Sequence, residues 1–382
     1  MTNAADKKPE DTKVLVVGGG FAGMCSAISL REHGYQVDLI DLDPEWRVFG
    51  AGITINGTTL RAYRHLGMYD EIADKGAIVR STLLYRADGV VLREMAVAET
   101  VGEEPATAGI MRPILHEMMS SRVRAAAVSV KLGVTVESLT QQEDEVTVTL
   151  SDGTSGTYDL LIGSDGIASG IRQMVFPETA GATAMGQGCW RIAINRPASI
   201  DKGEIYFGHQ FPAGITLCGP DEMYMWLLTP DDGSLWVDDK DGVALLRERL
   251  EGFGGNIGWI RDNMNESHWV NYRPLEALIQ PQDKWVKGRV VLVGDSAHAT
   301  TPHLASGAGM AVEGAVVLAQ ELSREGQSID DALAAYVDRR FERCRDVVNS
   351  GVAIGKAQMA GLSPEEIGRL MGGALHRLAQ PF

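Results

Sequence analysis

The first strong hydrophobic pattern of the chain is a continuous apolar run at Lys13–Val17, which follows a polar opening segment. An uninterrupted run of this length, rich in β-branched residues, is typical of a parallel strand buried on both faces. Glycines come next, and residues 22–33 then have the pattern of a helix that we expect to stop at Gly34. A second apolar run ends on Asp41. The chain is therefore predicted to begin with a strand–helix–strand unit of the α/β class.

Later segments alternate between strands and turns. Residues 146–163 alternate and turn like a hairpin before a buried strand, and residues 81–95 predict another hairpin that turns at Asp88 and Gly89. The stretch 188–230 is rich in β-branched and aromatic residues and is broken by Gly, Pro and Asp, so we expect a mostly antiparallel sheet. Residues 329–360 have helical periodicity, and a further helical piece is expected near the end of the chain.

The glycines after the first run bring in candidate chemistry. Gly18, Gly20 and Gly23 fit the spacing G-x-G-x-x-G, which permits a tight turn, close approach of a pyrophosphate to the backbone, and close packing of helix on strand. The helix N-terminus would offer free N–H groups to the phosphates. Asp41 lies 18 residues after Gly23, where an acid can accept ribose hydroxyls. The motif predicts dinucleotide binding but leaves FAD and NAD open, and the alternative is a glycine-rich turn of another α/β domain.

Composition narrows the possible partners. The chain has 382 residues, 45% of them hydrophobic, which is enough for a large core in two or three domains. A formal charge of -16 repels phosphate backbones and anionic membranes, so we expect neither nucleic acid nor membrane as a partner. The four cysteines form no metal-like cluster, so we expect reduced thiols, no metal and a cytoplasmic location. The opening segment has no apolar region typical of a signal peptide.

Two further motifs occur in the middle and near the end of the chain. The pattern D-x-x-x-G-x-D-G-x-x-S-x-x-R is followed by Asp159, Gly163, Asp165, Gly166, Ser169 and Arg172. The segment 292–315, LVGDSAHATTPHLASGAGMAVEGA, places an acid, two histidines, a proline and glycines before an expected helix. With the opening motif, this ordered set resembles the class A flavoprotein monooxygenases, the single-component aromatic hydroxylases such as para-hydroxybenzoate hydroxylase. The resemblance spans nearly the whole chain, and its length and C-terminal run are most similar to the compact pyridine-ring oxygenases of that family.

The resemblance implies bound FAD and assigns residues to it. Asp295 would hold the ribityl chain, Pro302 would lie against the isoalloxazine ring, and the helix beginning at Gly307 would point its N-terminus at the ring edge that becomes anionic on reduction. Arg47 matches an arginine just before the loop that lines the ring, and Arg112 matches one that reaches the phosphate region. The full cofactor set implied in this way is Gly18, Gly20, Phe21, Ala22, Gly23, Asp41, Leu42, Arg47, Gly52, Ile53, Arg112, Asp165, Gly166, Gly294, Asp295, Pro302, Gly307, Ala308, Gly309 and Met310.

The sequence departs from the family pattern at three positions. Asp41 stands where the family usually has Glu, Ser306 where Gln is frequent, and Met310 where Asn or Cys is common. A shorter acid at position 41 can still accept hydroxyls.

The resemblance also implies the architecture. We expect an α/β fold in which a Rossmann-like FAD-binding domain carries an inserted, mostly antiparallel substrate sheet and C-terminal helices. The FAD-binding domain would be discontinuous, with residues 1–78, 105–178 and 280–345, and the sheet domain would comprise 79–104 and 179–279. Residues 346–382 would form a C-terminal helical segment. Nothing in the sequence decides between a monomer and a homodimer.

The activity implied is hydroxylation of an aromatic or N-heteroaromatic ring with NADH or NADPH and O2 as co-substrates. The substrate would be a phenol or a pyridine carboxylate, activated by a base or polar partner in the pocket. Thr54 stands where some pyridine-acid hydroxylases have a catalytic histidine, which argues against that base here. The candidate catalytic and substrate residues are Arg191, His209, Tyr224, Trp226, Tyr272, Pro302 and His303. An aromatic residue on an apolar strand more often belongs to the core, and an arginine such as Arg191 more often forms a surface ion pair than a substrate contact.

Other classes stay open at this point. A flavin-dependent halogenase would carry a W-x-W-x-I-P signature, which is absent. An isoprenoid reductase would need a longer apolar stretch in the sheet. A non-redox flavoprotein, either a cyclase or a binding module, would show no ligand-stimulated oxidation of NAD(P)H.

Overall fold

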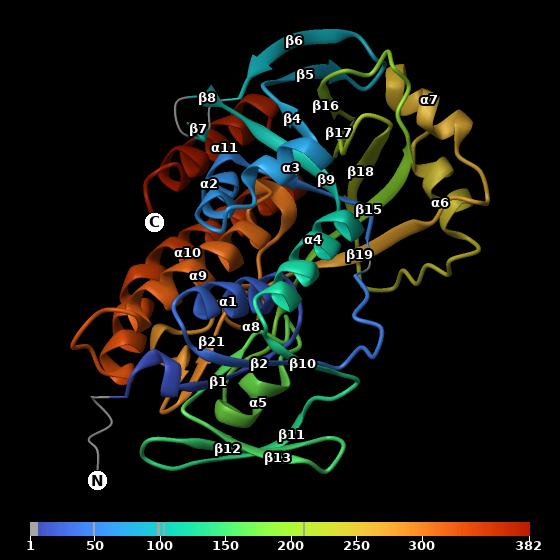
Figure 1. Ribbon diagram of the computed structural model, residues 1–382. Coiled ribbons are helices and arrows are strands. Elements are labelled where there is room, and N and C mark those ends of the chain that lie inside the picture. The colour runs from blue at the N-terminus through green and yellow to red at the C-terminus, as the bar shows by residue number, and fades with distance from the viewer. Residues whose placement is uncertain (1–6, 49, 98–99, 102–103, 209–210) are drawn as a thin grey trace.

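The computed structural model describes residues 7–48, 50–97, 100–101, 104–208 and 211–382. Two large sheets dominate the molecule, one in the lower and one in the upper half of Figure 1. Over the described residues, no helix is both long and apolar enough to cross a membrane.

The lower sheet is built from strands that are far apart in the sequence. Its order is β10-β2-β1-β14-β21-β20, and all neighbours are parallel except the last pair. Its strands are β1 (Lys13–Val17), β2 (Gln36–Asp41), β10 (Ser129–Leu132), β14 (Leu160–Gly163), β20 (Val286–Lys287) and β21 (Val290–Leu292). Because β1, β14 and β21 are adjacent, the three glycine motifs that follow them meet at one edge of the sheet.

Helices from both ends of the chain cover this sheet (Figure 1). Helix α1 (Phe21–Glu32) packs on α9 (Gly307–Leu322), which packs on the long α10 (Ile329–Met359). The last helix, α11 (Pro364–Leu378), packs against α10. A separate antiparallel sheet lies at the bottom of Figure 1 and consists of β11 (Val136–Gln141), β12 (Val146–Leu150) and β13 (Ser155–Tyr158).

The upper sheet has the order β19-β15-β18-β17-β16-β5-β6, and only β16 and β5 are parallel. One of its faces packs an apolar core against α6 (Gly242–Arg249) and α7 (Gly255–Asn263). The expected hairpin is present as β5 and β6, with Gly89 at a φ of 89° in its turn. The strands are β5 (Ser81–Arg86), β6 (Val91–Ala96), β15 (Thr183–Asn195), β16 (Gly203–Phe207), β17 (Pro212–Leu217), β18 (Glu222–Pro230) and β19 (Val270–Ala277).

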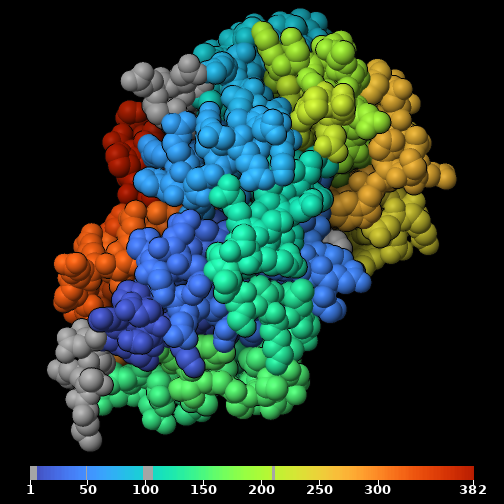
Figure 2. Space-filling view, viewed as in Figure 1, coloured from blue at the N-terminus to red at the C-terminus, as the bar shows by residue number. Residues whose placement is uncertain are grey.

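Two small sheets, β3-β9-β4 and β7-β8, and three helices lie between the two halves in the sequence and the fold. Figure 2 shows the segment of α2 and α3 beside α4 on one face of the molecule. These elements are β3 (Gly52–Ile55), α2 (Gly57–His65), α3 (Tyr69–Lys75), β4 (Ala77–Val79), β7 (Thr100–Val101), β8 (Glu104–Pro105), β9 (Thr107–Met111) and α4 (Arg112–Ala125). The remaining short helices are η2 (Pro9–Asp11), α5 (Gly170–Val175), η3 (Gln282–Lys284), α8 (Asp295–His298) and η4 (Pro302–Leu304).

The fold class expected from the sequence is confirmed: a Rossmann-like α/β unit, a mostly antiparallel sheet and C-terminal helices. The division into domains stays a prediction. Its boundary between residues 345 and 346 falls inside the continuous helix α10, so a domain border at that point would cut one helix.

Candidate active site

The loop between β1 and α1 is tightly packed on one side and open on the other. Gly18 has a φ of 103°, and a Cβ there would lie 2.4 Å from the carbonyl oxygen of Ser164. A Cβ on Gly23 would lie 1.9 Å from the carbonyl oxygen of Gly18. By contrast, a Cβ on Gly20 would meet none of the described residues within 4 Å, and none of their side chains caps the N-terminus of α1, which begins after it. The loop therefore leaves backbone N–H groups available to a ligand.

The acid at the end of β2 orders the neighbouring loops. The Asp41 carboxylate accepts hydrogen bonds from the Gly19 N–H at 2.6 Å and from the Asp43 N–H at 2.8 Å. A carboxylate has about four acceptor sites, so Asp41 can also accept ribose hydroxyls. Two predicted cofactor residues lie less favourably. The Leu42 side chain is exposed, and Arg47 is an exposed partner of Asp43, whose pKa that hydrogen bond lowers to about 2.

The middle motif acts as scaffold for the last one. The Ser164 hydroxyl donates to the carbonyl oxygens of Val17 and Gly18, and Asp165 accepts the Ile171 N–H at the start of α5. The buried Arg172 donates to the carbonyl oxygen of Ser296 at 2.9 Å. Gly166, with a φ of 83°, forms the turn between them. These contacts fix the segment that carries Gly294 and Asp295.

Asp295 and Arg112 both have polar atoms without a partner among the described residues. Gly294 has a φ of 67°, and a Cβ there would lie 2.8 Å from the Cβ of Ala22 at the start of α1. Asp295 is exposed and forms no hydrogen bond or ion pair with the described residues. Arg112 lies with its guanidinium carbon 5.6 Å from the ring centroid of Phe21, and its buried Nε has no hydrogen-bond partner in the described structure. Burial, together with the charge of Arg191, lowers the pKa of Arg112.

The loop before α9 presents a second uncapped helix N-terminus. Ser306 occupies the cap position, but its hydroxyl donates to the carbonyl oxygen of Leu304 and accepts from the Asn56 amide instead of capping α9. A Cβ on Gly309 would lie 2.0 Å from the Thr59 Oγ1 of α2, so glycine is required there by packing. A Cβ on Gly307 would meet only the Thr300 methyl group, at 3.3 Å.

His303 faces α10. Its Nδ1 lies 2.8 Å from the Thr301 hydroxyl, and its Nε2 lies 3.0 Å from the Gln358 Oε1. Burial lowers the pKa of His303 to about 4, and a neutral ring can donate from Nε2 and accept at Nδ1. Both ring nitrogens thus have protein partners, whereas Pro302 beside it is half-buried at the start of η4.

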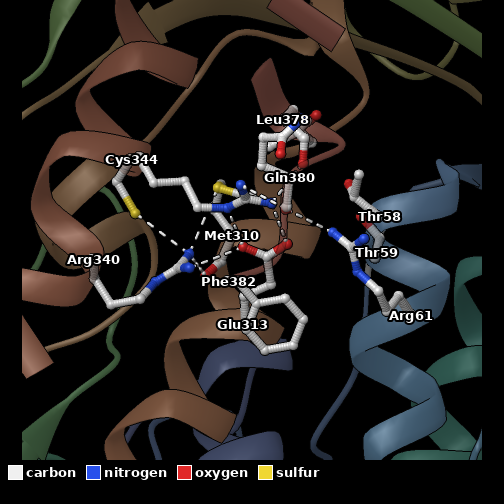
Figure 3. A network of polar contacts seen from close by, with 12 residues as sticks. Thr58, Thr59, Arg61, Met310, Glu313, Arg340, Cys344, Leu378, Gln380 and Phe382 are labelled. Atoms are coloured by element: carbon white, nitrogen blue, oxygen red, sulfur yellow. Dashed lines mark hydrogen bonds and ion pairs between the residues drawn. The ribbon is translucent and has the colours of Figure 1, made fainter. Parts of the chain in front are cut away.

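A charged network between α9 and α10 supports the N-terminal half of α9 (Figure 3). The fully buried Glu313 accepts from Arg340 at 2.9 Å and from Arg343 at 2.8 Å. Arg340 also donates to the carbonyl oxygen of Met310 at 3.3 Å. Arg343 donates to the carbonyl oxygen of Leu378, and thereby connects α9 to the C-terminal end of α11.

One face of the upper sheet carries polar and aromatic side chains. The register of β15 places Arg191 directly between Trp226 on β18 and Asn271 on β19. Arg191 is half-buried and has no hydrogen bond or ion pair with the described residues. Ala193, two residues after Arg191 on β15, is paired with Tyr224 on β18. The Tyr224 hydroxyl lies 2.7 Å from the Thr54 Oγ1. A Cβ on Gly52 would lie 2.3 Å from the Tyr224 ring, so this face adjoins the strand that continues to Ile53.

One predicted substrate residue, Tyr272, does not belong to this face. Tyr272 is paired with Trp190, and their ring centroids lie 4.5 Å apart in the core beneath α6. Because successive side chains alternate across a strand, Tyr272 points away from its neighbour Asn271. His209 lies outside the described residues.

Sequence reasoning overlooked several residues that the fold brings to these surfaces. Asn271 is only 8% exposed, and its place beside Arg191 depends on strand pairing. A polar side chain inside an apolar strand is a signal that could have identified it. No such signal identifies three residues in or beside the dinucleotide loop, namely Gly19, Trp46 and His116.

Comparisons with known proteins agree with this geometry. The model of the family described as "FAD binding domain" matches residues 11–350. The chain is 30% identical to the putative FAD-dependent monooxygenase YetM of Bacillus subtilis, over 91% of this chain and 94% of that protein. It is 30% identical to the 2-heptyl-3-hydroxy-4(1H)-quinolone synthase of Pseudomonas aeruginosa, over 80% of each. The crystal structure of Klebsiella pneumoniae HpxO, complexed with FAD and uric acid, superposes with a TM-score of 0.84 at 23% identity, covering 97% of this chain and 94% of that one.

Proposed function

This chain belongs to the FAD-binding domain family, and from that membership we propose that it is an FAD-dependent monooxygenase that hydroxylates an aromatic or N-heteroaromatic small molecule. NADH or NADPH and O2 are its co-substrates. When bound, FAD supplies the redox chemistry that activates O2 and delivers one oxygen atom to the ring.

One observation carries the proposal: the polar groups left without partners are the groups that an extended dinucleotide needs. In the part of the chain that the structure describes, no side chain caps the N-terminus of α1 or that of α9. Asp295 and the Nε of Arg112 lie unpaired in the described structure. The N-terminus of α1 and an arginine suit a pyrophosphate, and the N-terminus of α9 suits an electron-rich ring edge. A carboxylate without a protein partner suits hydroxyl groups. The residues present therefore fit FAD.

We assign the cofactor residues accordingly. Gly20 and Arg112 would hold the pyrophosphate at the tight turn that Gly18 permits, Asp41 would hold the ribose and Asp295 the ribityl chain. Pro302 and the glycines from Gly307 to Gly309 would line the isoalloxazine ring.

The face of the upper sheet would bind the substrate. Arg191 is a half-buried cation with no carboxylate partner among the described residues, in a protein of net charge -16, which favours an anionic ligand. Trp226 beside it offers an aromatic surface, and Asn271 offers an amide. Tyr224 and Thr54 would supply the polar partner that orients a ring hydroxyl or ring nitrogen. The relatives named for a quinolone and crystallised with uric acid support an N-heteroaromatic ring.

The test is the oxidation of NADH and NADPH by the FAD-loaded protein in the presence of urate, 4-quinolones, pyridine carboxylates and phenolic acids, with peroxide measured alongside. We expect at least one ligand to accelerate oxidation while little peroxide forms. A protein that binds FAD but shows no acceleration with any of these ring classes would favour the non-redox flavoprotein.

A further inference from the structure

Trp46 has a backbone conformation that a bulky side chain rarely adopts. Its φ is 50°, in the left-handed region that favours glycine. Strained residues persist where surrounding contacts determine them, and they cluster at ligand-binding sites. The contacts of Trp46 therefore indicate what the strain maintains.

Those contacts join the dinucleotide loop to α4. The indole is only 5% exposed, and its N–H donates to the carbonyl oxygen of Gly19 at 2.8 Å. The guanidinium of Arg124 lies 4.9 Å from the ring centroid, and the imidazole of His116 meets the indole edge-on at 5.7 Å. Trp46 thus packs between the first glycine loop and two side chains of α4.

Gly19 is fitted to this indole. It occupies a variable position of the G-x-G-x-x-G pattern, which itself does not demand glycine there. In the structure, a Cβ on Gly19 would lie 2.3 Å from the Trp46 Nε1 and 3.1 Å from the Asp41 Oδ2. Glycine at position 19 is therefore required by Trp46, and the Gly19 N–H is directed to Asp41 at 2.6 Å.

His116 presents a free atom at the same place. Its Nε2 is buried and has no hydrogen-bond partner in the described structure. It lies one helical turn after Arg112, whose Nε is likewise buried without a partner, so both belong to one face of α4. A pair of unsatisfied buried nitrogens beside a dinucleotide loop is costly unless a ligand accepts from them.

We propose that Trp46, Gly19 and His116 form a latch for the adenosine monophosphate half of FAD, a role that rests on the proposed function. In this latch Trp46 holds the loop in its binding conformation, and the His116 Nε2 contacts an oxygen of the adenosine-side phosphate or ribose. Holding a loop in its bound conformation slows dissociation of the ligand. The latch acts on the half that FAD has and FMN lacks. Loss of the latch should therefore weaken the binding of FAD and leave the binding of FMN unchanged.

The test compares FAD and FMN binding to the apoprotein of three variants by flavin fluorescence. W46F keeps the ring and removes the N–H donor, and H116F keeps the edge contact and removes the nitrogen. We expect each to weaken FAD binding about tenfold, through faster release for W46F, with FMN affinity unchanged. The matched control W236F removes a similar indole hydrogen bond from a residue that is 84% exposed, and should change neither flavin.

The binding data distinguish failure of the latch from failure of the proposed function. Unchanged FAD binding in both variants, or equal losses for FAD and FMN, would overturn the latch while leaving the proposed function intact. Wild-type protein that binds no FAD would instead overturn the proposed function. If W46F does not fold, H116F alone decides by the same comparison.

Discussion

Arg191 is the residue on which the assignment of an anionic substrate depends. It lies between Trp226 and Asn271, and its guanidinium meets no carboxylate in the described structure. A charge-assisted hydrogen bond to a ligand is worth about 1.5–3 kcal/mol, which corresponds to roughly ten- to hundredfold in affinity.

R191Q should therefore raise the Kd of an anionic ring substrate by about ten- to hundredfold and leave FAD bound. R191K should retain part of the affinity, because it keeps the charge and loses the planar fork. The measurement is perturbation of the bound-flavin spectrum by ligand. R93Q, on the exposed strand β6 of the same sheet, is the control. Equal weakening of neutral and anionic ligands would show that Arg191 shapes the sheet without binding charge.

His303 gives the protein a specific acid sensitivity. Burial lowers its pKa from about 6.5 to about 4, so the unfolded chain binds a proton that the folded chain does not between these values. Stability should consequently fall as pH decreases from about 6.5 to about 4, by on the order of 1–3 kcal/mol from this group. H303Q should flatten this part of the profile in urea unfolding. A profile that is unchanged by H303Q would assign the acid sensitivity to other groups.

At the scale of elements, the helices are positioned by close backbone approaches. The N-terminus of α9 lies against α2 because Gly309 leaves room for Thr59. Adding a methyl group to a tightly packed site costs about 1–3 kcal/mol.

G309A should therefore destabilise the protein by about 1–3 kcal/mol and weaken FAD binding, because α9 would be displaced from α2. Removing the Thr59 side chain as well, in T59A/G309A, should restore much of the FAD affinity. G372A is the contrasting control: a Cβ there would meet no described residue within 4 Å, so the variant should be neutral or stabilised by up to about 1 kcal/mol. Thermal unfolding with and without FAD measures both effects. Failure of the double variant to recover would mean that Gly309 serves something other than this packing.

Elements with a local signal were predictable. The strand–glycine–helix unit, the hairpin with Gly89 and the long C-terminal helix follow from periodicity and turn residues, and the structure has all of them. Side-chain placement across strands was not predictable, because it depends on pairing. Tyr272 and Asn271 are neighbours in sequence, yet only Asn271 lies beside Arg191. The positive φ of Trp46 results from tertiary contacts with Gly19 and α4, which no local pattern encodes.

At the scale of the whole molecule, the buried Glu313 connects regions that are distant in the sequence. Two arginines of α10 converge on it, and Figure 3 labels one of them, Arg340. The other, Arg343, also donates to the carbonyl oxygens of Leu378 and Gln380. Because Arg340 contacts Met310, this network supports the turn proposed to face the flavin ring.

E313Q should destabilise the protein by about 3–5 kcal/mol, since it leaves two arginine charges without their buried partner. E342Q removes a solvent-exposed ion pair with Arg345 on the same helix and should cost less than about 1 kcal/mol. Urea unfolding of both variants gives the comparison. Similar losses for the two would mean that the buried network contributes no more than a surface pair.

The most direct test of the account is turnover under oxygen-18 gas with the ligand that best stimulates NAD(P)H oxidation, followed by mass spectrometry of the product. A monooxygenase built on this FAD site predicts a product with one heavy oxygen atom, formed in equal amount to the NAD(P)H consumed. A product that takes its oxygen from water, or an unmodified ligand with all reducing equivalents recovered as peroxide, would contradict hydroxylation by this protein.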